Sequence, residues 1–213
     1  MKHLIITTAI VPEEICFQKL GYSYEQRSAD YIKSFEHGLL FKDNFNSITI
    51  IEMISNEKID ILENSGINVY YSKFDNLFVN KGINEIFHII DFFKNSNIKD
   101  DDLIIKITGR YLMMNDNILK IDSDFIAKYD GDIYSPLNRG IHTFFFAFKK
   151  KLFIEFFNSL DFVNNNYDNI CIEWLLKDFM IQKNIPILDK NYKLGVITCL
   201  YNKEIDKWTR VLT

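Results

Sequence analysis

The sequence has few cysteines, no long apolar run and no excess of positive charge, and each shortage argues against a class of protein. Its three cysteines, Cys16, Cys171 and Cys199, lie far apart and form no C-x-x-C pair, which argues against a disulfide framework and favours a reducing, cytoplasmic compartment. No apolar run approaches the roughly 20 residues of a transmembrane helix. The net charge of −4 argues against nucleic acid as the main partner.

The first residues resemble a signal peptide only in part. The apolar stretch near the N-terminus is interrupted by Thr7 and Thr8 and is followed by Glu13 and Glu14, without a small-residue cleavage site. We therefore expect a buried first strand there and no signal peptide.

Several enzyme signatures are also missing. The chain contains no G-x-G-x-x-G, no Walker lysine loop, no G-x-S-x-G and no H-E-x-x-H, and its four histidines lack metal-ligand spacing. We therefore assign no residue to a metal site.

What is present is an ordinary folded composition, with 47% hydrophobic, 15% aromatic and 25% charged residues in 213 positions. This length fits one large domain with a real core. In the first half, apolar runs alternate with amphipathic stretches. Ser23 to Gln26 predicts a capping box that opens a helix to about residue 40, Ser55 a helix that stops at Gly66, and Asn80 a further helix. The expected strands are 4–9, 48–52, 69–71 and 103–107.

This alternation predicts an α/β fold with a doubly wound, Rossmann-type, mostly parallel sheet flanked by helices. The second half is mixed. It suggests a partly helical stretch over 116–128, strands at 132–135, 143–148 and 192–200, and helices at 149–160 and from Asp168 or Asn169 to about 183.

Polar residues gather where the parallel strands should end. Because these ends share one edge of the sheet, residues distant in sequence converge there. Lys81, Lys106 and Arg110 would suit a diphosphate, and Glu52 would suit a base or ribose. Each alone also fits a structural role: Lys106 as a snorkelling lysine, Arg110 as a partner of Asp116 and Glu52 as a solvated strand end. The full set is Thr7, Thr8, Glu52, Lys81, Gly82, Lys106, Gly109, Arg110 and Tyr111.

Five motifs carry a resemblance to a known family. They are T-T (7–8), R-x-x-x-Y-I-x-S-F (27–35), I-I-E (50–52), N-K-G-x-x-E (80–85) and I-K-I-T-G-R-Y (105–111). In this order the chain resembles a group of bacterial and large-virus glycosyltransferases with the GT-A fold, over most of residues 1–150. The resemblance implies a nucleotide-diphosphate sugar donor, with UDP-sugar favoured, and a glycan or other saccharide acceptor. It also implies one domain, 1–213, with a donor half (1–115) and an acceptor half (116–213).

The resemblance implies roles for the strand-end residues. Thr7, Thr8, Glu52 and Arg27 would hold the base and ribose, and the helix opening at Lys81 and Gly82 would lie near the donor. GT-A enzymes usually carry a D-x-D metal motif after the fourth strand, where this chain has Thr108-Gly109-Arg110. We predict that Lys106 and Arg110 replace the metal's charge; Mn²⁺ or Mg²⁺ elsewhere, for example at Asp132, stays open.

For catalysis the first candidate is Glu173, which would take a proton from the acceptor hydroxyl in an inverting reaction. Asp132 and His142 are second choices. The sequence leaves two other functions open: a catalytically silent nucleotide-sugar-binding module and a sugar-phosphate nucleotidylyltransferase. Oligomeric state and peripheral membrane contact also stay open.

Overall fold

The computed structural model describes residues 1–10, 23–129, 141–162, 167, 170–186, 196–202 and 207–212. The expected strand 132–135, with Asp132, and the expected caps Asp168 and Asn169 lie outside these residues. The elements are β1 (Lys2–Thr8), α2 (Tyr24–Leu40), η1 (Lys42–Asn44), β2 (Ser47–Glu52), α3 (Asp60–Glu63), β3 (Asn68–Tyr71), α4 (Lys81–Lys94), β4 (Leu103–Thr108), β5 (Tyr111–Met113), η2 (Asn117–Lys120), β6 (Phe125–Tyr129), β7 (Ile141–Lys149), α5 (Lys150–Ser159), α6 (Ile172–Gln182), β8 (Val196–Asn202) and β9 (Lys207–Leu212).

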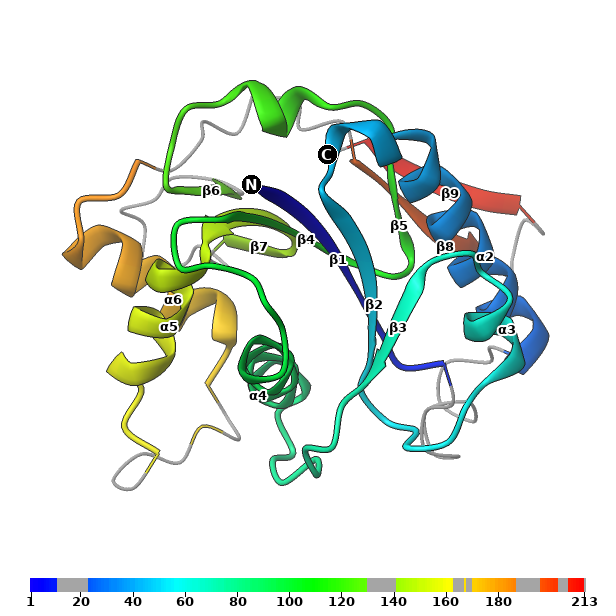
Figure 1. Cartoon of the computed structure of the whole chain (residues 1–213), viewed down its shortest axis with the longest axis horizontal. Helices are drawn as coiled ribbons and strands as arrows, with labels where there is room; N and C mark the ends of the chain where they lie inside the picture. Colours follow the sequence, from blue (N-terminus) through cyan, green and yellow to red (C-terminus); the bar gives the residue numbers. More distant parts are fainter. Residues whose placement is uncertain are drawn as a thin grey trace.

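The main sheet has six strands in the order β3-β2-β1-β4-β7-β6 (Figure 1). The strands β3, β2, β1 and β4 are parallel, whereas β7 runs antiparallel to β4, and β6 antiparallel to β7. The chain is therefore an α/β protein with a mostly parallel central sheet, as the alternating pattern predicts. Its order reverses between β1 and β4, which is the switch point of a doubly wound sheet.

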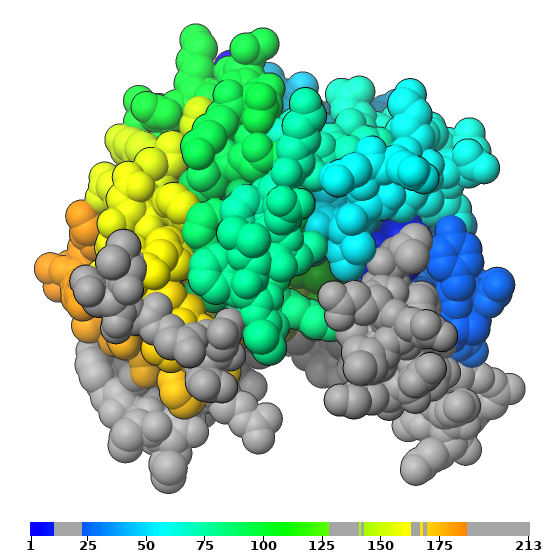
Figure 2. All heavy atoms as spheres, turned by 90° about the horizontal axis from the view of Figure 1, so that it is seen from below, coloured from blue at the N-terminus to red at the C-terminus, as the bar shows by residue number. Residues whose placement is uncertain are grey.

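Helices cover both faces of this sheet. On one face, Ile5, Ile51 and Ile104 join a core cluster with α4, α5 and α6. On the other, Leu4 and Ile50 pack with α2 and α3. This alternation follows from the period of two along a strand, and the near-continuous apolar runs reflect burial of both faces. Figure 2 shows α4 between α5 and the residues around β3.

Local capping signals give a mixed outcome. The capping box at Ser23 is present, and the side chain of Asn80 caps α4. The expected cap at Ser55 is wrong, because α3 begins only at Asp60 and Ser55 instead bonds the backbone of Glu57. Gly66 has φ +74°, a conformation that favours glycine.

A second sheet, β5-β8-β9, holds the end of the described chain. The described part of the strand expected over 192–200 belongs to β8, whereas the sequence does not predict β5 or β9. The stretch 116–128 contains only the short helix η2 before β6. The hydroxyl of Ser34 on α2 donates to the carbonyl of Tyr111 at the start of β5, 2.8 Å away. Since β4 ends at Thr108 and β5 begins at Tyr111, the chain passes from the main sheet into the second one at Gly109 and Arg110.

Among the described helices, none combines the length and the apolar character needed to cross a membrane.

Candidate functional site

The ends of β1 and β4 meet at the switch point of the sheet. Thr7 pairs with Thr108 in the parallel register, and the N–H of Gly109 donates to the carbonyl of Thr7 at 2.8 Å. An added Cβ on Gly109 would lie 2.4 Å from Cε1 of Tyr31 and 3.0 Å from the Thr7 carbonyl oxygen. Glycine is therefore required here, because the Tyr31 ring packs directly against the turn.

Arg27 holds the chain that leaves β1. Its Nε and Nη2 donate to the carbonyl of Ala9 at 2.9 and 2.6 Å, and Nη2 lies 3.3 Å from the hydroxyl of Tyr31. That hydroxyl also accepts the N–H of Ala9. The predicted donor-site residue Arg27 is therefore buried and fixes the backbone beyond β1.

Glu52 joins the ends of β1 and β2. Its carboxylate is 0% exposed and accepts the hydroxyl of Thr8 at 2.7 Å and the backbone N–H groups of Ile54, Ser55 and Ile10 at 3.0–3.4 Å. Burial raises the pKa of Glu52, against the lowering effect of these hydrogen bonds. Thr7, Thr8 and Glu52 are thus brought together as expected, but all three are buried and bond to protein groups.

Arg110 is the half-buried cation that follows β4. It lies near Asp30 of α2, which is 0% exposed and whose two carboxylate oxygens have no hydrogen-bond partner among the described residues. Burial raises the pKa of Asp30 to about 7, and the charges of Arg110, Lys33 and Arg27 lower it in part. Asp116, the partner of Arg110 in the alternative structural role, pairs with Lys120.

Lys106 lies on the opposite face of β4, below α4. Its side chain is 1% exposed, and Nζ contacts Oε1 of Glu85 at 2.9 Å, Oγ1 of Thr108 at 2.9 Å and the carbonyl of Thr143 at 2.7 Å. Nζ also lies 5.5 Å from the centre of the Phe146 ring. Nζ thus has two hydrogen-bond acceptors and one ion-pair partner, as many close oxygens as an ammonium group has donors. Lys106 is therefore buried beneath the exposed residues of the site, and Glu85 is the acidic partner of its ion pair.

Two carboxylates connect to this lysine. Oε1 of Glu85 also accepts the hydroxyl of Thr7, and Oε1 of Glu173 accepts the hydroxyl of Thr143 at 2.8 Å. The network therefore joins β1, α4, β4, β7 and α6. Sequence reasoning did not assign Glu85 to the site, although it is the last residue of the N-K-G-x-x-E motif. Its position four residues after Lys81 was the available signal.

The start of α4 docks on the start of α6. Asn80 accepts the N–H of Gly82 and donates to the carbonyl of Ile170 at 2.6 Å. A Cβ on Gly82 would lie 2.6 Å from Cγ2 of Ile172. Gly82 therefore permits close helix packing, with Lys81 exposed beside it.

Several side chains at this edge of the sheet are exposed to solvent, at least in part. Tyr111 stacks on Phe144 with ring centres 4.3 Å apart, and Trp174, beside Glu173, is 46% exposed. His142 belongs to β7, but its side chain lies outside the described residues, as does Asp132. The partly exposed polar residues are Glu85, Thr108, Arg110, Tyr111, Thr143 and Glu173. Within the described ranges, no three His, Cys, Asp or Glu side chains are grouped so that they could hold a metal ion.

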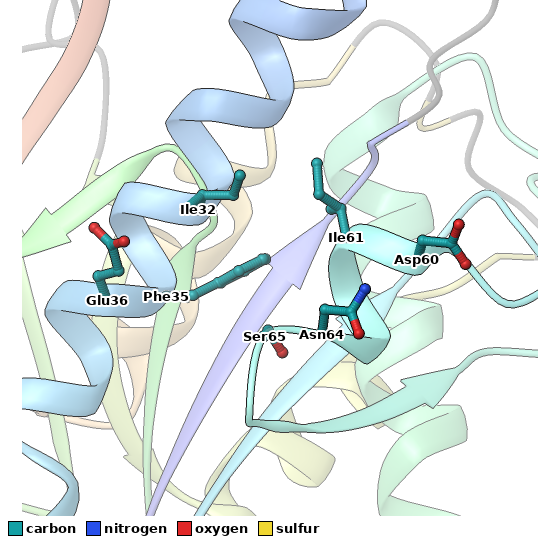
Figure 3. Close-up of a pocket in the computed structure, with 7 residues that line it drawn as sticks. All are labelled: Ile32, Phe35, Glu36, Asp60, Ile61, Asn64 and Ser65. Carbon is teal, nitrogen blue, oxygen red and sulfur yellow. The ribbon is translucent and has the colours of Figure 1, made fainter.

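A groove of about 340 Å³ lies elsewhere, between α2 and α3. Figure 3 shows Ile32, Phe35 and Glu36 of α2 across from Ile61 and Asn64. None of the residues predicted for the site lines this groove. We place the candidate site at the strand ends, because the converging charged and hydroxyl groups lie there.

No protein-family model matches the sequence, and no curated protein matches it in sequence. Solved structures do match. One is a protein assigned as a nucleotide-diphospho-sugar transferase from Desulfovibrio desulfuricans G20, with TM-score 0.50 and 10% identity over 88% of this chain and 78% of that one. Another is the inositol-1-phosphate CTP transferase from T. maritima, with TM-score 0.51 and 12% identity over 89% and 86%. At these identities the likeness shows that the chain shares the α/β fold of these two transferases.

Proposed function

We propose that the protein is a glycosyltransferase that moves a sugar from a nucleotide-diphosphate donor, with a UDP-sugar favoured, to a glycan or other saccharide acceptor. One observation carries the proposal. At the switch point of a transferase-like sheet, Arg110 stands on the α2 side, and the carboxylates of Glu85 and Glu173 stand on the α4 and α6 side. A cation on one side of the edge and two carboxylates on the other suit a ligand that joins a diphosphate to a polyhydroxylated group.

In this proposal the buried cluster at the ends of β1 and β2 shapes the nucleotide side. Arg27 and Glu52 fix the backbone segments that follow β1 and β2. The base and ribose lie against these segments. Arg110 then contacts the diphosphate. Residues 1–115 bind the donor and residues 116–213 the acceptor.

The chemical step breaks the bond between the sugar's anomeric carbon and the diphosphate oxygen, which leaves with the bonding electron pair. Arg110 stabilises this growing negative charge with the positive charge of its guanidinium group. The acceptor hydroxyl oxygen forms the new bond to the anomeric carbon. Its proton passes to Glu173 if the configuration inverts, and the hydroxyl of Thr143 orients that carboxylate.

The place where GT-A enzymes usually carry their metal motif does not fit a divalent cation in this chain. Thr108, Gly109 and Arg110 supply no carboxylate, and hard cations prefer oxygen ligands with negative charge. Arg110 supplies the positive charge there. Lys106 acts indirectly, because its three donors already contact Glu85, Thr108 and Thr143.

Thermal-shift titration tests the donor site. We expect a UDP or GDP sugar to raise the melting temperature of the purified protein, with or without Mn²⁺, because a ligand that binds only the folded state stabilises it. No stabilisation by any of them would refute the donor site. Release of diphosphate from CTP or UTP with a sugar phosphate would instead identify a nucleotidylyltransferase. Binding of nucleotide sugars without any turnover would identify a silent module.

A further inference from the structure

The ion pair between Lys106 and Glu85 is unequal in exposure. Lys106 is 1% exposed, whereas the side chain of Glu85 is 18% exposed. Solvent at the edge of the sheet therefore meets the carboxylate and not the ammonium. A buried charged pair carries a large desolvation cost, and apolar residues of similar size would join α4 to the sheet as well or better. The pair therefore calls for a role beyond packing.

The carboxylate of Glu85 is held from two strands. Thr7 of β1 donates to Oε1, Nζ of Lys106 of β4 lies 2.9 Å from the same oxygen in an ion pair, and within the described residues Oε2 makes no hydrogen bond. One oxygen thus fixes the side chain, and the other stays available at the edge. Such an acceptor is preorganised, because its position does not depend on the ligand.

An ionised carboxylate only accepts hydrogen bonds. It attracts the hydroxyl groups of a sugar and repels phosphate oxygens. Glu173 is another partly exposed carboxylate at this edge, connected to the same lysine through Thr143. Arg110, next to Asp30, stands on the α2 side. The edge therefore has hydrogen-bond acceptors on the α4 side and a cation on the α2 side, so that the two ends of one ligand would meet different groups.

We propose that Glu85 is a specificity-determining residue that accepts hydrogen bonds from hydroxyl groups of the donor's sugar, with Lys106 and Thr7 as the residues that position it. This role rests on the proposed glycosyltransferase function and deepens it. It orients the donor, with the sugar toward α4 and the diphosphate toward Arg110.

The test compares two ligands on three variants. Glu85→Gln keeps the shape and removes the charge, but it leaves Lys106 buried without its counter-ion. Glu85→Gln/Lys106→Met removes both charges and keeps the test valid if the single variant folds poorly. Asp91→Asn is the matched control, because Asp91 lies on the same helix and accepts hydrogen bonds from Tyr70 and Ser72, away from the strand ends. Calorimetric titrations use the nucleotide sugar that most stabilises the wild type, and its nucleoside diphosphate.

We expect the Kd of the nucleotide sugar to rise about tenfold in both Glu85 variants, the difference between a charged and a neutral acceptor. The Kd of the nucleoside diphosphate should change less than about twofold, which is only about 0.4 kcal/mol, and Asp91→Asn should change neither value. Equal losses for both ligands, or no loss for the sugar, would overturn the role of Glu85 alone. A wild type that binds neither ligand would overturn the proposed function and this role together.

Discussion

Asp30 is a buried carboxyl group whose environment disfavours its charged form. Burial raises the pKa of its carboxyl to about 7, above the value in an unfolded chain. The native state therefore holds a proton between about pH 4 and pH 7 that the unfolded state has released, and stability falls as pH rises through this range. We expect Asp30→Asn to be about 1–2 kcal/mol more stable than the wild type at pH 8 and nearly equal to it at pH 5.

Urea unfolding at the two pH values measures this difference, with the exposed Asp122→Asn as a control that should change little at either pH. A loss of stability at pH 8 in Asp30→Asn would show that the attraction of Arg110 for the charged carboxylate outweighs the burial cost.

Gly109 and Gly38 give a matched pair of glycine substitutions. Gly109→Ala would place a Cβ 2.4 Å from the Tyr31 ring and 3.0 Å from a backbone oxygen, so the turn must move. In Gly38→Ala on α2, the Cβ would meet flexible side-chain atoms of Ile6 and Leu4 at 3.4–3.5 Å, an ordinary contact. We expect Gly109→Ala to lose about 1–3 kcal/mol of unfolding free energy and Gly38→Ala to be neutral or up to about 1 kcal/mol more stable. Chemical denaturation of both variants measures this, and equal stabilities would contradict it.

At the scale of the element, local sequence signals predict the structure correctly where one side chain decides the outcome. The hydroxyl of Ser23 and the amide of Asn80 each bond N–H groups of the helix that follows, and both were visible in the sequence. The predicted cap at Ser55 is wrong. The N–H of Ser55 donates to the buried carboxylate of Glu52, and the position of that carboxylate depends on the fold. The sequence does not predict β5 and β9, because both strands depend on pairing with β8, which for β5 lies far along the chain.

Asn80 does more than cap its helix. Its Oδ1 accepts two N–H groups of α4, and its Nδ2 donates to the carbonyls of Tyr167 and Ile170, at 2.9 and 2.6 Å. Asn80→Ala should therefore cost about 2–4 kcal/mol, because it removes a cap and two hydrogen bonds, and leaves the carbonyl of Ile170 without its donor, whereas that of Tyr167 still accepts the N–H of Ile170. Ser23→Ala, which removes only an exposed cap, should cost about 1 kcal/mol. Unfolding curves of the two variants compare them, and equal costs would show that the contacts to the α6 side contribute nothing.

At the scale of the whole molecule, the sequence predicted the sheet better than the site. Apolar periodicity gave the parallel strands, and their shared edge brought Thr7, Thr8, Glu52 and Gly109 together. The apolar periodicity could not show which charged side chains point to solvent, because that depends on which face of β4 each side chain occupies. Lys106 and Arg110 look equivalent in the sequence, yet one is buried with three acceptors and the other is half-exposed near Asp30.

This difference predicts that the two cations fail differently. Arg110→Ala should weaken binding of the nucleoside diphosphate about tenfold or more, since a hydrogen bond to a charged group contributes about 1.5–3 kcal/mol. The sugar end should be unaffected, so nucleotide sugar and nucleoside diphosphate should lose affinity by the same factor. Lys151→Ala is the control, because that lysine pairs with Asp101 in an exposed ion pair of little energetic weight. Calorimetric titration of each variant with both ligands measures the factors. Wild-type affinity of Arg110→Ala for the diphosphate would remove Arg110 from the site, whereas a loss confined to the nucleotide sugar would reverse the orientation of the donor between α2 and α4.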